Sequence, residues 1–173
     1  RGLLGKKIAE VAPGNLTKTF FCLGGAEANE NAIKIARFFT GRHKILARYR
    51  SYHGATAGTM ALTGDPRRLV WEPSLMPGVV HFLDPYRYRS TFHRTNAGIS
   101  EAEFCRDYLN HLEEIITYEG PETIAAILME SVTGTNGIII PPDGYLTGVR
   151  ALCDKYGIVM IADEVMSGFG RTG

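Results

Sequence analysis

The residues best suited to chemistry stand where apolar runs of the sequence end. Glu130 follows the apolar run 123–129, and Asp163 follows the apolar run 158–162. Ligands collect at the carboxyl ends of strands in open α/β sheets, and a carboxylate next to a buried strand needs a partner. A cationic ligand is one such partner. A helix N-cap or a solvated loop position is the plainer alternative for either acid taken alone.

A glycine-rich turn offers the chemistry for binding a phosphate. Gly24, Gly25 and Ala26 lie between the β-rich run 19–23 and a segment with helical spacing of its apolar residues. The free N–H groups and positive dipole end at a helix N-terminus bind phosphate, and glycine lets the backbone approach it closely. Ordinary turn formation is the alternative for the glycine pair alone.

A second turn combines an aromatic ring, an imidazole and a glycine at Tyr52, His53 and Gly54. A phosphate cradle, a carboxylate able to face a cationic ring nitrogen and this turn are the parts that hold a phosphorylated heteroaromatic cofactor. Each part alone has an ordinary structural explanation. Their conjunction predicts a site for such a cofactor.

Alternating strands and helices are expected to position these residues. Helical spacing predicts helices over 3–11, 26–39, 55–62, 101–118 and 144–156, and apolar runs predict strands over 19–23, 44–49, 79–83, 123–129 and 158–162. Buried strands separated by helices indicate an α/β fold with three layers, a mostly parallel sheet with helices on both faces. Glu30 and Lys34 are expected to form an i,i+4 ion pair, and 84–100 a long polar loop.

Composition excludes several classes of protein. The 173 residues are 45% hydrophobic and 21% charged, which excludes a disordered chain, collagen and a coiled coil. Lys and Arg (19) against Asp and Glu (18) leave a net charge of +1, which provides no basic footprint for nucleic acid or an anionic membrane. No apolar run approaches the roughly 20 residues that span a bilayer.

Cysteine and histidine positions carry two further expectations. The 3 cysteines lie far apart without a CxxC pair, which fits a reducing compartment and a cytoplasmic protein. The 5 histidines lack HExxH or other metal-ligand spacing, so no metal site is expected. A nicotinamide dehydrogenase and a nucleoside triphosphatase are disfavoured, since neither GxGxxG nor GxxxxGK[ST] occurs.

The motifs resemble those of the class III (ω-amino acid type) pyridoxal-phosphate aminotransferases. The similar segments, in the family's order, are GGAEANE (24–30), SYHG (51–54), ILMESVTGTNGIIIPPDGYL (127–146) and DEVMSGFGRTG (163–173), and together they cover nearly the whole chain. The resemblance implies the large domain of a fold type I pyridoxal-phosphate-dependent transferase, with pyridoxal 5'-phosphate as cofactor.

The resemblance also implies roles for single residues. Gly25 and Ala26 would donate backbone N–H groups to the cofactor phosphate. Tyr52 would stack on one face of the pyridine ring and Val165 would pack on the other. Asp163 would pair with the protonated ring nitrogen, so that the cofactor withdraws electrons from the substrate.

Three positions of the motifs need separate comment. Many relatives have serine where this chain has Gly24 and Ala26, so hydroxyl contacts to the phosphate are not expected here. Glu130 would lie near the ring oxygen of the cofactor and orient a neighbouring group rather than carry the proton. His53 would support its turn.

The implied activity is transamination between an amino donor (an ω-amino acid, taurine or an amine) and a keto acid such as pyruvate, by a homodimer. The lysine that forms the Schiff base in this family would lie beyond Gly173. Residues 1–173 are therefore expected to be a fragment of the cofactor-binding large domain, without the small domain and inactive alone. A decarboxylase or aminomutase on the same scaffold, or a non-catalytic cofactor-binding homologue, stays open as an alternative.

The substrate expectation rests on ALTGDPRR (61–68) and on the loop 84–100, which look most like taurine or ω-amino acid:pyruvate aminotransferases. Arg87 and Arg89 in that loop would suit a sulfonate or a carboxylate. A solvated loop with scattered arginines is the alternative.

Overall fold

Parallel strands form the centre of the fold in the computed structural model, which describes residues 1–93 and 98–173. The strands are β1 (Lys44–Arg48), β2 (Val79–Phe82), β3 (Ile124–Glu130) and β4 (Val159–Asp163), in the spatial order β2-β1-β3-β4. All three neighbouring pairs are parallel. Every residue of β3 is buried. A strand covered on both faces has no solvated side, which explains the apolar run 124–129 that precedes Glu130.

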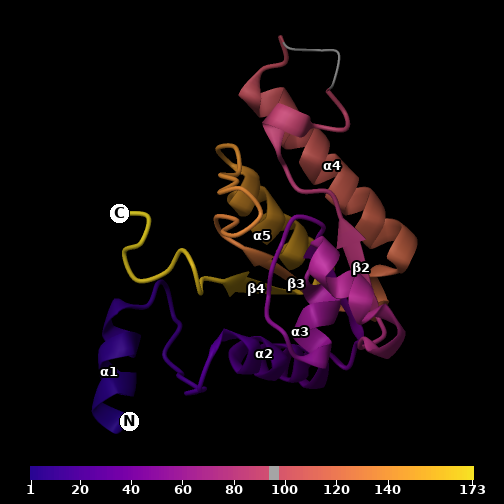
Figure 1. Ribbon diagram of the computed structural model, residues 1–173. Helices are drawn as coiled ribbons and strands as arrows, with labels where there is room; N and C mark the ends of the chain where they lie inside the picture. The colour runs from indigo at the N-terminus through magenta and orange to yellow at the C-terminus, as the bar shows by residue number, and fades with distance from the viewer. Residues whose placement is uncertain (94–97) are drawn as a thin grey trace.

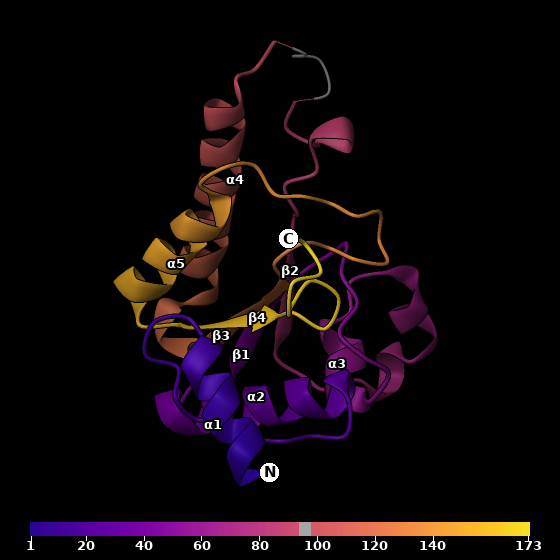
Figure 2. The same cartoon turned by 90° about the vertical axis from the view of Figure 1, so that its left-hand side faces the viewer.

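Helices cover both faces of this sheet (Figures 1 and 2). On one face lie α2 (Gly25–Thr40) and α3 (Ala57–Leu62), and on the other lie α4 (Glu101–Glu119) and α5 (Tyr145–Tyr156). α1 (Gly2–Val11) stands apart from the sheet in Figure 1, and none of its residues is buried. Short 3-10 helices lie in the connections, at Pro66–Val70, Glu72–Ser74, Arg87–Arg89 and Pro121–Thr123.

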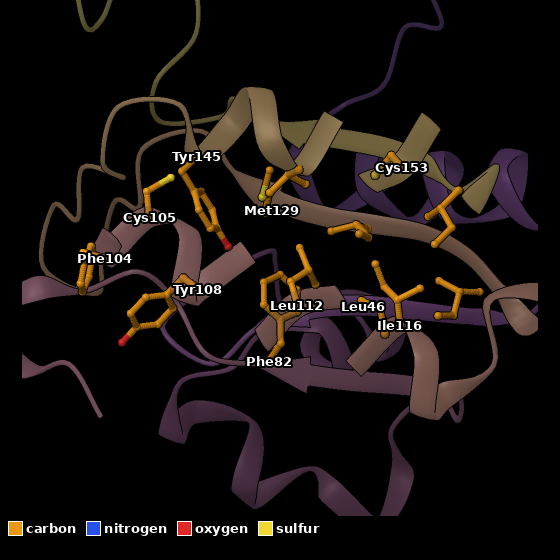
Figure 3. Packing of buried hydrophobic residues seen from close by; sticks show 14 residues of the cluster. Leu46, Phe82, Phe104, Cys105, Tyr108, Leu112, Ile116, Met129, Tyr145 and Cys153 are labelled. Carbon is orange, nitrogen blue, oxygen red and sulfur yellow. The ribbon is translucent and has the colours of Figure 1, made fainter. Parts of the chain in front are cut away.

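Two apolar cores hold the layers together. Alternate residues of β1 point to opposite faces, so Leu46 joins the core under α4 and α5 while Ile45 and Ala47 join the core over α2 and α3. Figure 3 shows the larger core, where Leu112 of α4 and Tyr145 of α5 lie with residues of the sheet. Burying one such large side chain stabilises a fold by about 1.5–3 kcal/mol, so these two cores stabilise the packing of the helices on the sheet.

The predicted α/β three-layer class is confirmed, and most predicted elements occur within two residues of their expected bounds. The strand predicted over 19–23 is wrong. That segment pairs with no strand among the described residues and runs outside the sheet (Figure 1), with Phe20 68% and Leu23 95% exposed. Its β-propensity is not realised because strand structure depends on a paired neighbour and a buried face.

Two smaller expectations have different outcomes. The described part of the loop 84–100 contains no α-helix or strand and only the 3-10 turn at 87–89, as expected, and residues 94–97 lie outside the described residues. The ion pair of Glu30 with Lys34 is wrong, because the Glu30 carboxylate instead accepts hydrogen bonds from the start of α3.

Among the described residues, no helix has the length and apolar character needed to cross a membrane.

Candidate active site

The two acids predicted to follow strands lie side by side at one edge of the sheet. Glu130 and Asp163 are the last residues of β3 and β4 and are register partners. Both are buried, with 3% and 6% of their surface exposed. Parallel strands bring their carboxyl ends to the same edge, so the sheet itself places these carboxylates next to each other.

Asp163 is held by three donors. Its Oδ2 accepts a hydrogen bond from Asn29 Nδ2 (2.8 Å) and lies 2.8 Å from His53 Nδ1, and its Oδ1 accepts one from the Val165 N–H (3.0 Å). Burial raises the pKa of the Asp163 carboxyl, but the hydrogen bonds from His53, Val165 and Asn29 outweigh it and leave that pKa below its ordinary value. The carboxylate is therefore ionised and can face a cation.

His53 supports Asp163 as well as its own turn. An ionised carboxylate only accepts hydrogen bonds, so the His53 Nδ1 atom next to it carries the proton. The His53 N–H is in turn bound by Thr63 Oγ1 (3.0 Å). The imidazole is thus fixed from both its ring and its backbone.

Asn29 is a site residue that the sequence analysis missed. Its Nδ2 donates to both Asp163 Oδ2 and the His53 carbonyl (3.0 Å). Its position in the sequence could have indicated this role. Asn29 lies within GGAEANE, one helical turn after Gly25, so both residues face the same side of α2.

The turn at 51–54 packs against the first turn of α2. Gly54 has φ +134°, and a Cβ atom there would lie 2.7 Å from the Ala26 Cβ and 2.6 Å from Thr59 Oγ1. Only glycine permits this approach. Glu30, one turn further along α2, accepts hydrogen bonds from the N–H groups of Gly58 and Thr59 in α3, which fixes the other end of the connection.

Glu130 holds two parts of the cavity wall through its carboxylate. Its Oε1 accepts from the Tyr52 N–H (3.0 Å) and its Oε2 from the Gly134 N–H (2.6 Å). The Nη2 atom of the fully buried Arg48 donates a hydrogen bond to the backbone carbonyl of Glu130. Both carboxylate oxygens therefore bind backbone, which is the geometry of an orienting group.

The N-terminus of α2 opens toward the same place. The helix begins at Gly25, and Gly24, the N-cap, provides no side-chain cap. The first N–H groups of a helix have no partner within the helix and carry a partial positive charge. Val165 lies against this turn, because a Cβ atom at Gly25 would be 2.7 Å from Val165 Cγ2.

A cavity of about 370 Å³ lies among these groups. Its lining residues are Gly25, Ala26, Tyr52, His53, Gly54, Ala55, Glu130, Thr135, Asp163, Val165 and Met166. Every residue that the sequence analysis assigned to the cofactor is among them, although the roles of single residues stay predictions. Arg87 and Arg89 are not among them. No cluster of side chains able to hold a metal ion occurs within 1–93 and 98–173.

With this geometry in view, the sequence comparisons identify the family. The model of the family Aminotransferase class-III matches residues 2–173, and the chain belongs to this family. The acetylornithine aminotransferase of Corynebacterium efficiens is 45% identical over 158 residues, covering 91% of this chain and 33% of the relative. The hypotaurine/taurine–pyruvate aminotransferase of Paracoccus denitrificans is 37% identical over 177 residues, covering 99% and 37%. The chain thus spans about a third of the length of these relatives.

Solved structures agree with the family and the fold. The taurine:2-oxoglutarate aminotransferase of Bifidobacterium kashiwanohense, in complex with PLP and glutamate, matches with a TM-score of 0.91 and 52% identity, over 99% of this chain and 38% of its own. An aminotransferase of Vibrio fluvialis in its PMP-bound form matches with a TM-score of 0.89 and 36% identity, over 99% and 38%. The fold is that of the fold type I pyridoxal-phosphate-dependent transferases, as predicted, and pyridoxal phosphate is the cofactor of this class of enzyme.

Proposed function

We propose that the cavity binds pyridoxal 5'-phosphate and that, in a longer protein, it catalyses transamination between an amino donor and a keto acid. One observation carries the proposal: an ionised buried carboxylate, an aromatic ring and an uncapped helix N-terminus line the same cavity. These are the groups that a cationic ring nitrogen, a pyridine ring and a phosphate require.

The phosphate end of the cofactor fits the start of α2. Gly25 and Ala26 line the cavity and offer N–H groups at the positive end of a helix of 16 residues. The side chain missing at Gly24 leaves this end uncapped. In this proposal the phosphate takes the place of a capping side chain.

Tyr52 and Val165 would hold the ring of the cofactor, and Asp163 would face its nitrogen. When bound, the cofactor supplies an electron sink for the amino donor, provided that its ring nitrogen stays protonated. The Asp163 carboxylate favours that protonated form because an opposite charge at close range stabilises a cation. His53 and Asn29 keep the carboxylate in place.

Glu130 orients the substrate side of the site. Its carboxylate holds the Tyr52 and Gly134 N–H groups, so we assign it a positioning task and no proton transfer.

For substrates we propose an ω-amino acid, taurine or an amine as the donor and a keto acid such as pyruvate as the acceptor. The support is the similarity to a taurine:2-oxoglutarate aminotransferase and to a hypotaurine/taurine–pyruvate aminotransferase.

We further propose that residues 1–173 are part of the cofactor-binding large domain of a homodimer, that the small domain and the lysine that carries the cofactor lie outside them, and that they are inactive alone. The free thiols of Cys22, Cys105 and Cys153 support a reducing, cytoplasmic location.

Borohydride reduction of the full-length protein incubated with pyridoxal phosphate tests this function, followed by peptide mapping and an assay of taurine, β-alanine and simple amines with pyruvate. We expect label on one lysine outside residues 1–173 and transfer of the amino group to pyruvate. Bound cofactor without label would indicate a non-catalytic homologue, and label with release of CO₂ would indicate a decarboxylase.

A further inference from the structure

An arginine lies behind the aromatic wall of the cavity. The guanidinium carbon of Arg67 is 4.1 Å from the centroid of the Tyr52 ring. Tyr52 lines the cavity and Arg67 does not, so the guanidinium acts on the ring from outside the space that a ligand would fill. A cation this close to an aromatic face is attracted by the negative charge of the ring face.

A buried carboxylate fixes this guanidinium. Arg67 Nε lies 3.0 Å and 2.8 Å from the two carboxylate oxygens of Asp65, Arg67 Nη2 also donates to Asp65 Oδ2, and the Arg67 N–H donates to Asp65 Oδ1 (2.9 Å). The Asp65 side chain is only 5% exposed, whereas that of Arg67 is 49% exposed. Such forked contacts hold the plane of a guanidinium in one orientation.

The same group contacts a second residue of the cavity wall. Arg67 Nη2 donates to Thr135 Oγ1 (3.1 Å), and Asn136 Nδ2 donates to Asp65 Oδ2 (3.3 Å). Thr135 lines the cavity together with Tyr52. Arg67, held by Asp65, therefore connects two lining residues, Tyr52 and Thr135, that lie far apart in the sequence.

The contact with Arg67 adds a restraint on the Tyr52 side chain. Glu130 binds only the backbone N–H of Tyr52 and does not hold its ring. Fixing the backbone N–H leaves the ring free to rotate about its side-chain bonds. A ring that stacks on a ligand binds it more tightly when its orientation is set beforehand, since less freedom is lost on binding.

We propose that Arg67, anchored by Asp65, is a positioning residue that holds the Tyr52 ring in the orientation for stacking on the cofactor. This inference rests on the proposed function of the cavity. Arg67 does not touch the cofactor and acts only through Tyr52.

The chain offers a matched control in the next residue. The Arg68 guanidinium lies 5.8 Å from the ring centroid of Tyr49 and 3.6 Å from the Glu72 carboxylate. Neither Arg68 nor Tyr49 lines the cavity. Arg68→Met therefore removes a cation over a tyrosine without touching the wall of the site.

The experiment measures binding of pyridoxal phosphate to the full-length protein by equilibrium dialysis, together with visible circular dichroism of the bound cofactor. We expect Arg67→Met to weaken binding about 2- to 5-fold and to reduce the circular dichroism band, Arg67→Lys to restore part of both, and Arg68→Met to change neither. In a Tyr52→Leu background, Arg67→Met is expected to have no further effect, because coupled residues are not additive.

Two results would overturn the inference while leaving the proposed function intact: wild-type affinity and dichroism in Arg67→Met, or an undiminished effect of Arg67→Met in the Tyr52→Leu background. A wild-type protein that binds no pyridoxal phosphate would instead overturn the proposed function itself. Far-ultraviolet circular dichroism of each variant separates a loss of binding from a loss of folding.

Discussion

At the scale of single residues, the candidate site depends on the Asp163 carboxyl, which the fold keeps ionised although it is buried. Asp163 is nearly inaccessible, and its ionised form persists only because His53, Asn29 and the Val165 N–H bind it. A buried carboxylate with this many donors is suited to facing a cation. In the proposed function, this carboxylate would stabilise the protonated state of the cofactor's ring nitrogen.

Asp163→Asn in the full-length protein is expected to retain the cofactor and to lower the rate of a single turnover about 10- to 100-fold. The reason is that a hydrogen bond to a charged group contributes about 1.5–3 kcal/mol. Stopped-flow absorbance with an excess of amino donor measures the rate. Asp154→Asn is the control, because Asp154 is an exposed acid paired with Arg150. An unchanged rate in Asp163→Asn would contradict the assigned role.

The lowered pKa of Asp65 predicts how the stability of the fold depends on pH. Burial raises the pKa of its carboxyl, but the hydrogen bonds from Arg67 and Asn136 and the charge of Arg67 leave that pKa below its ordinary value of 3.8. A lowered pKa means that the ionised form stabilises the fold above pH 3.8 and that this contribution is lost as the pH falls through the lowered pKa.

We therefore expect Asp65→Asn to reduce the free energy of unfolding by about 1 kcal/mol at pH 7. The difference from wild type should shrink as the pH falls below 3.8. Thermal unfolding of both proteins across this pH range measures it, and a difference independent of pH would show that the Asp65 charge is not responsible.

The sequence could predict residues that line the cavity and that lie in a recognisable local motif, such as Gly25, Tyr52 and Asp163. It could not predict the partners that meet only in the folded chain. Asn29 and Asp163 are 134 positions apart, and the placement of Arg67 over Tyr52 depends on the path of the connection that contains the 3-10 helix Pro66–Val70. Such contacts are set by tertiary packing, which a local pattern does not encode.

At the scale of elements, the ends of the strands and the connections behind them build the site. β3 and β4 bring two acids to one edge, and the connection after α3 returns beneath the end of β1, where the Gly64 N–H donates to Ser51 Oγ. This return places Asp65 and Arg67 beside Tyr52.

Apolar patterns predicted most strands and the helix layers correctly. They were wrong for the segment 19–23, because an apolar run becomes a strand only beside a partner strand.

Gly64→Ala is expected to destabilise the fold by about 2 kcal/mol or more. A Cβ atom at Gly64 would lie 2.1 Å from the Tyr49 carbonyl and 2.2 Å from the Arg48 carbonyl, and backbone atoms cannot move aside as a flexible side chain can. Chemical denaturation compares this variant with Gly2→Ala, where a Cβ atom meets nothing within 4 Å. Equal stability of the two variants would contradict the close approach.

The loop 84–100 bears on the choice of substrate. Arg87 donates to the Ile99 carbonyl and lies over Phe104 (5.8 Å), and Arg89 lies over Tyr88 (5.7 Å). Because neither arginine lines the cavity, we expect Arg87→Ala and Arg89→Ala to change KM for taurine and for an uncharged amine equally, within about twofold. A selective rise in KM for taurine would return these arginines to a role in binding the acidic donor.

At the scale of the whole molecule, residues 1–173 leave large apolar side chains uncovered. Leu3 is 85% exposed, Phe38 93%, Phe39 80% and Phe169 91%. Large exposed apolar surfaces often mark sites where another protein segment, a partner or a ligand binds. Together with the span of about a third of the relatives' length, this supports a longer protein.

Residues 1–173 expressed alone are accordingly expected to bind the dye ANS and to unfold at a lower temperature than the full-length protein. The uncovered side chains of α1 and α2 provide the dye-binding surface. Fluorescence titration and thermal unfolding of both proteins measure the difference. A monodisperse piece that binds no dye and melts at the same temperature would show that these faces need no cover.

The most direct test of the site is a crystal structure of the full-length protein with pyridoxal phosphate. We predict the ring nitrogen at about 2.7–3.2 Å from an Asp163 carboxylate oxygen, the phosphate at the N–H groups of Gly25 and Ala26, and the ring between Tyr52 and Val165. A cofactor bound elsewhere, or one whose ring nitrogen faces a group other than Asp163, would contradict the site proposed for this chain.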